Sequence, residues 1–105
     1  MDQEKNNWVK VSDDGVSIKL SSSIRNIRWN DIEEINAYKL DRVTIDEICF
    51  DIVLSETVIT ISEKIEGWQI FTDKLESVLT GFDNEWFSRV AHPAFKTNLT
   101  TVYQR

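Results

Sequence analysis

Short strand-like runs occupy about the first sixty residues, ahead of the one long helical pattern in the chain, which spans about Gly67 to Leu79. Runs of strands followed by a helix build an α+β domain, whereas a parallel βαβ sheet requires strands and helices in alternation. The order of elements therefore predicts a curved antiparallel meander of about six strands, capped by one amphipathic helix.

Apolar residues at every second position mark the predicted strands. The clearest strand carries Ile48, Phe50 and Ile52 on one side. An Asp-Gly turn at 12–15 predicts a hairpin between the first two strands. We expect strands at 8–11, 16–20, 27–29, 35–40, 48–54 and 57–61, with one helical turn begun by Asn30 or Asp31 after the third.

The helical pattern has one apolar stripe, at spacings of three and four residues. Its members are Trp68, Phe71, Leu75, Val78 or Leu79, and Phe82. Gly81 is a C-cap signal, and Asp83 or Asn84 can begin a short helical turn that ends before Pro93. We expect the stripe to close the core, and the extended stretch at 99–103 to pair with a sheet edge.

The chain of 105 residues predicts a single domain, 1–105, with the polar segment 1–7 disordered. No apolar run approaches the roughly 20 residues of a membrane span, so we expect no membrane partner. The single Cys49 excludes an intramolecular disulfide. Since no signal-like segment follows Met1, we expect a cytoplasmic location.

The net charge of −6 argues against a nucleic-acid partner, because binding phosphates requires clustered Lys and Arg. Such acidity often serves only solubility. If it serves recognition, the partner is a basic protein.

The chain offers little for catalysis or metal binding. A nucleophile requires a neighbouring base, and the only histidine, His92, directly precedes Pro93. Cys49 has no second thiol for a soft metal and is expected to be a small, half-buried apolar residue. We therefore expect a non-enzymatic protein with no cofactor and no metal. A hydrolase centred on His92 is a minor alternative, which requires a carboxylate beside the imidazole in a cleft.

One group of carboxylates gathers around the turn between the fourth and fifth strands, and we call it the acidic rim. It consists of Asp41, Asp46, Glu47 and Asp51. A solvated hairpin that protects a sheet edge explains it. The alternative is a footprint for a cationic protein, with an exposed aromatic, Tyr38 or Trp86, as the anchor.

Several short motifs resemble a family of small bacterial proteins with a PH-like barrel, over nearly the whole chain from Trp8. They are Trp29-x-Asp31-Ile32-x-x-Ile35, Ala37-Tyr38-Lys39-x-Asp41, Asp46-x-Ile48, Glu66-Gly67-Trp68 and Trp86-x-x-x-Val90-x-x-Pro93-Ala94-Phe95. The resemblance implies an architecture, a partly open barrel, and carries no active site.

In size and charge the chain is also similar to bacterial immunity proteins, which block a co-encoded toxin by capping its basic surface. This resemblance implies a protein that neutralises a basic, nuclease-type toxin through the acidic rim. The alternative is a PH-like ligand-binding or regulatory module, which requires a pocket lined by convergent polar groups between helix and barrel.

Overall fold

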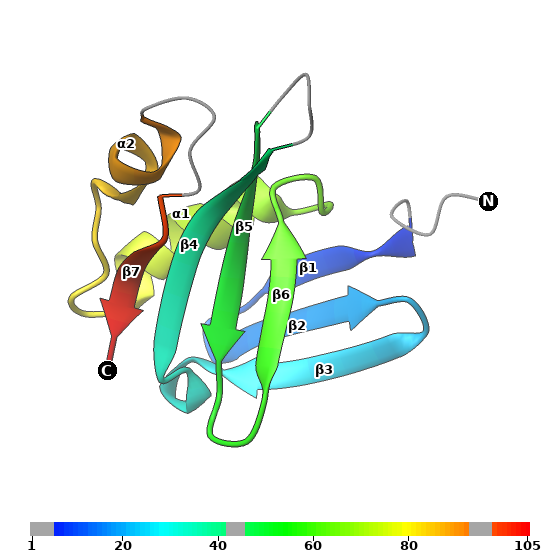
Figure 1. Ribbon diagram of the computed structural model, residues 1–105. Coiled ribbons are helices and arrows are strands. Elements are labelled where there is room, and N and C mark those ends of the chain that lie inside the picture. Colours follow the sequence, from blue (N-terminus) through cyan, green and yellow to red (C-terminus); the bar gives the residue numbers. More distant parts are fainter. Residues whose placement is uncertain (1–5, 42–45, 93–97) are drawn as a thin grey trace.

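The computed structural model describes residues 6–41, 46–92 and 98–105. The fold is α+β, as predicted, and Figure 1 shows the arrangement of its elements. In chain order they are β1 (Trp8–Val11), β2 (Gly15–Leu20), β3 (Ser23–Arg28), the 3-10 turn η2 (Trp29–Asp31), β4 (Glu34–Asp41), β5 (Asp46–Val53), β6 (Val58–Ser62), α1 (Trp68–Val78), α2 (Trp86–Ala91) and β7 (Thr100–Gln104).

The strands form two antiparallel sheets, and the prediction of one continuous six-stranded meander is wrong. The first sheet has the order β1-β2-β3 and the second the order β6-β5-β4-β7. In Figure 1 the strands of the first sheet run across the view, while those of the second run from top to bottom. Among the described residues no strand pairing joins the two sheets, so the barrel is not closed.

The division occurs at Trp29, which the alternation placed in the third strand. The indole of Trp29 is buried, and its Nε1 donates a hydrogen bond to the carbonyl oxygen of Ser12, 3.2 Å away. Oδ2 of Asp31 accepts the backbone N–H of Arg28 at 3.0 Å. These bonds hold a 3-10 turn against the β1–β2 turn, so the chain changes direction before β4 begins.

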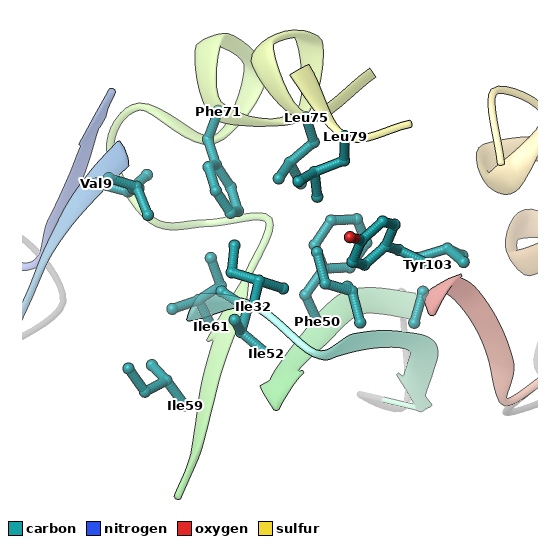
Figure 2. Packing of buried hydrophobic residues seen from close by; sticks show 14 of the residues in the cluster. Val9, Ile32, Phe50, Ile52, Ile59, Ile61, Phe71, Leu75, Leu79 and Tyr103 are labelled. Atoms are coloured by element: carbon teal, nitrogen blue, oxygen red, sulfur yellow. The ribbon is translucent and has the colours of Figure 1, made fainter. Parts of the chain in front are cut away.

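The helix α1 closes the core from one side of the four-stranded sheet, as its stripe predicted. It follows Gly67, whose φ of 92° is left-handed. Phe71, Leu75 and Leu79 point from the helix toward the strands in Figure 2, and Phe50 of β5 lies among them.

Both ends of the described chain are tied to the fold. The segment predicted to pair with a sheet edge does so, because β7 pairs with β4. Asn6 and Asn7 were predicted to be disordered, yet Oδ1 of Asn7 accepts the N–H of Ser21 at 2.8 Å and the carbonyl of Asn6 accepts Lys19 Nζ at 2.8 Å. The rest of that segment, 1–5, lies outside the described residues, as do 42–45 and 93–97.

Candidate partner-binding face

On the side of the four-stranded sheet opposite α1 most described side chains are exposed or half-buried, whereas Glu47 and Cys49 near the start of β5 are buried. Ile48, Phe50 and Ile52 of β5 point to the core, so Asp51 and Val53 point to the other side. In Figure 1 the helix lies behind this sheet. We call this surface the open face: Glu34, Asn36 and Tyr38 of β4, Asp51 and Val53 of β5, Val58 and Thr60 of β6, and Thr101 of β7.

A row of four polar side chains crosses the open face, with one from each strand. The registers place Thr101 beside Asn36, Asn36 beside Asp51, and Asp51 beside Thr60. The hydroxyl of Thr101 donates to Asn36 Oδ1 at 2.7 Å, and that of Thr60 to Asp51 Oδ1 at 2.7 Å. Asn36 Nδ2 also donates to Glu34 Oε2 at 2.7 Å. This polar row, with the adjoining Glu34, is a preorganised surface that carries two carboxylates, Glu34 and Asp51.

Tyr38 and Asp51, both predicted site residues, meet on the open face. The phenol of Tyr38 donates to Asp51 Oδ1 at 3.0 Å. Burial, and then the hydrogen bond to Asp51, raise the pKa of Tyr38 to about 12. The phenol is therefore a neutral donor at physiological pH, and it fixes the orientation of the carboxylate.

The rest of the acidic rim does not gather with Asp51. Residues 46 and 51 differ by an odd number of positions, so Asp46 points to the core side of β5. Asp46 Oδ2 lies 3.4 Å from Nζ of the buried Lys39, which also donates to the carbonyl of Ala91 at 2.9 Å. Asp41 stands opposite Asp46 in the register, and its side chain lies outside what the structure describes.

Glu47 is buried, so its predicted exposure on the rim is wrong. It lies 3.5 Å from Lys64 Nζ in an ion pair. Both residues line a cavity of about 250 Å³ at the ends of β2, β5 and β6. Cys49, predicted to be half-buried, is fully buried and lines the same cavity. No described residue of α1 lines it, so it is not the expected pocket between helix and sheet.

Trp86 cannot serve as an exposed anchor, because it is part of the core and only 6% exposed. Its ring lies 4.9 Å from that of Phe50 and 6.4 Å from that of Trp68. The short helix α2 turns this residue inward and leaves the adjacent Phe87 56% exposed.

The other chemical candidates receive little support. The imidazole of His92 is exposed and makes no hydrogen bond or ion pair with any described residue. Within the described ranges no three His, Cys, Asp or Glu side chains are grouped to hold a metal ion. No helix in this part of the chain is long and apolar enough to cross a membrane.

Comparisons with protein-family models, with curated proteins and with solved structures find no match to this chain. The functional argument therefore rests on the open face itself.

Three residues of the polar row were missed by the sequence analysis: Asn36, Thr60 and Thr101. Alternation along β4 and β6 places Asn36 and Thr60 away from the core, which was an available signal. The position of Thr101 depends on the pairing of β7 with β4, which includes a register shift between Ile35 and Asn36. No local pattern encodes that shift.

Proposed function

We propose that this protein is a non-enzymatic binding protein that docks a basic protein partner on the open face. The single observation that carries the proposal is the hydrogen bond from Tyr38 to Asp51, a member of the polar row. None of the residues that define the open face is Lys or Arg, whereas Glu34 and Asp51 are acidic. A net charge of −6 adds long-range attraction for a cationic partner.

Asp51 is the proposed recognition residue. Its Oδ1 accepts two hydrogen bonds, from Tyr38 and Thr60, while its Oδ2 receives none from the described residues. An Arg or Lys of a partner can donate to Oδ2 without displacing the internal bonds. A charge-assisted hydrogen bond of this kind contributes about 1.5–3 kcal/mol. Since the carboxylate is already oriented, little side-chain entropy is lost on binding.

In its narrower form the proposal makes the protein an immunity protein against a nuclease-type toxin. A nuclease requires a cationic surface to hold phosphates, and such a surface complements the acidic open face. Capping that surface inhibits the toxin by excluding nucleic acid. The support for this form is the size and net charge of the chain and the two carboxylates of the open face.

We also propose that the architecture is a PH-like, partly open barrel. Two features support this: the strands of the two antiparallel sheets cross one another, and α1 closes the core that they share. Such a barrel is open at the sheet edges, because in the described part of the chain the edge strands β6 and β7 of the second sheet do not pair with the edge strands β1 and β3 of the first.

Site-specific photo-crosslinking tests the proposed function. A photoreactive residue replaces Thr60 on the open face or, as the control, the exposed Glu76 on α1. In an extract of the source organism we expect Thr60 to capture a protein rich in Lys and Arg, and Glu76 to capture none. The captured protein is then purified and its binding measured directly. Equal capture from both positions, or capture of an acidic protein, would contradict the proposal.

One observation favours the second candidate function, a small-ligand-binding module. The cavity of about 250 Å³ has apolar walls, including Leu20 and Ile61, and holds the Glu47–Lys64 ion pair. A small zwitterion matches one charge of each sign. We expect a free amino acid to raise the melting temperature if this function is correct, and Ile61→Trp, which fills the cavity, to remove the effect. If no standard amino acid raises the melting temperature, that ligand class is excluded.

A further inference from the structure

The outer side of the three-stranded sheet is a second charged surface, opposite in sign to the open face. Val9, Val16 and Ile18 point to the core, so alternate positions on the same strands point outward. We call this surface the basic face: Trp8, Lys10, Lys19, Ile24, Asn26 and Arg28. It contains three cations and no carboxylate, in a chain with a net charge of −6. Three acidic residues, Asp13 and Asp14 of the β1–β2 turn and Asp31 of η2, border it at the Arg28 end.

The basic face is held in place by its own contacts. Nζ of Lys10 lies 4.5 Å from the centre of the Trp8 ring, a cation–π contact that covers part of the indole. Ser17 on β2 donates a hydrogen bond to Asn26 Oδ1 at 2.6 Å. Arg28 forms no ion pair with any described residue. The face therefore presents cationic groups on a rigid sheet.

Each face also has one exposed aliphatic side chain. On the basic face Ile24 is 54% exposed, and on the open face Val58 is 53% exposed. The basic face of one copy thus complements the open face of another in two respects: its cations match Glu34 and Asp51, and Ile24 can bury Val58. Nucleic acid would meet the same cations without an apolar partner for Ile24, and binding of an anionic membrane is an outcome that the tests below distinguish.

We propose that a second copy of this chain docks its basic face on the open face. The contact is heterologous, because each copy offers one face of each kind, so association continues to rings or short chains. The same contact covers Asp51 and thereby competes with the basic protein partner. This competition rests on the proposed function, whereas the self-association does not.

Two charge-reversal variants test the contact. The basic-face variant is Lys19→Glu with Arg28→Glu, and the open-face variant is Glu34→Lys with Asp51→Lys. In a solution of either variant alone, the two faces that would meet carry charges of the same sign. We therefore expect each variant to be a monomer in sedimentation velocity. A mixture of the two restores one native contact, between the unchanged faces, and we expect it to associate. Circular dichroism of each variant shows whether it is folded, and the mixture result requires folded chains.

Salt gives an independent readout on the unmodified protein. We compare about 0.1 M salt, where the Debye length of about 10 Å screens the net charge, with about 1 M, where it is about 3 Å. The expected self-association is weakened about tenfold at the higher salt. A protein that stays monomeric at about 1 mM in the lower salt overturns the proposal, as does a folded mixture that fails to associate. Binding of anionic vesicles or single-stranded DNA by the basic face, without self-association, overturns it too.

Discussion

The hydroxyl of Tyr38 donates a hydrogen bond to Oδ1 of Asp51, across the β4–β5 pair, at 3.0 Å. Thr60 donates to the same oxygen from β6, so the carboxylate is fixed from two strands. This arrangement joins the two residues that the sequence analysis proposed separately, as an acidic group and as an aromatic anchor. It makes the open face the centre of the proposed function.

The titration of Tyr38 tests this arrangement. Burial is the larger cause of its pKa of about 12, and the hydrogen bond to Asp51 is the next. In an absorbance titration we expect Asp51→Asn to lower this pKa toward the ordinary value of 10.0, but not to reach it, because burial remains. Tyr38→Phe identifies which phenol is observed. Native ionisation at the ordinary value would contradict the arrangement.

The same pKa has a consequence for stability. The folded state holds the phenolic proton more tightly than the unfolded state does. The contribution of the protonated Tyr38 to the free energy of unfolding is therefore fully present below pH 10, and it is lost as the pH rises from about 10 to about 12. Denaturation at several alkaline pH values measures it, and Tyr38→Phe should show a weaker decline over that range.

The replacement Trp86→Ala tests the corrected place of this residue in the core. Because the ring packs against Phe50 and Trp68, we expect a loss of about 3–5 kcal/mol in the free energy of unfolding. The neighbouring Phe87→Ala is the matched control, and we expect it to cost less than about 1 kcal/mol, since that side chain is exposed. Similar losses for both variants would show that Trp86 is not a core residue.

Lys39, near the C-terminal end of β4, connects this strand to both β5 and α2. Its Nζ contacts Asp46 and the carbonyl of Ala91. We expect Lys39→Met to destabilise the fold by about 3 kcal/mol, because it leaves a partly buried carboxylate without this cation. Asp46→Asn should lower the free energy of unfolding much less in the Lys39→Met variant than in the native chain. Additive losses, to within about 0.5 kcal/mol, would mean that the two residues do not interact.

Two glycines with left-handed backbones provide a matched pair. Gly67 and Gly81 have φ values of 92° and 88°. A Cβ at Gly67 would lie 2.2 Å from the carbonyl oxygen of Val9, whereas one at Gly81 would meet nothing within 4 Å. We expect Gly81→Ala to cost about 1 kcal/mol of backbone strain, and Gly67→Ala clearly more, since β1 must move away from the start of α1. Chemical denaturation of both variants gives the comparison.

Local patterns were sufficient to predict most elements of the fold. The alternation of Ile48, Phe50 and Ile52 and the stripe from Phe71 to Leu79 both follow from periodicity, and both face the core. The division into two sheets could not be predicted, because it depends on the tertiary contact between Trp29 and the β1–β2 turn.

The candidate site was only partly predictable for a related reason. Strand parity, which the sequence does show, sends Asp46 and Glu47 to opposite sides of the sheet, but the contacts that then hold each of them depend on tertiary structure. The burial of Glu47 depends on Lys64, which comes from the segment after β6. Charge reversal at Asp46 and Glu47 would therefore disturb internal ion pairs and would not test partner binding alone.

The most direct test of the central claim is the affinity of the captured partner for two variants of equal charge. Asp51→Lys changes the open face, and Asp73→Lys changes an exposed position on α1. By isothermal titration calorimetry we predict that Asp51→Lys weakens binding about 100-fold, which corresponds to about 2.7 kcal/mol, and that Asp73→Lys changes it less than about threefold. Equal effects of the two variants would contradict the claim that the open face binds the partner.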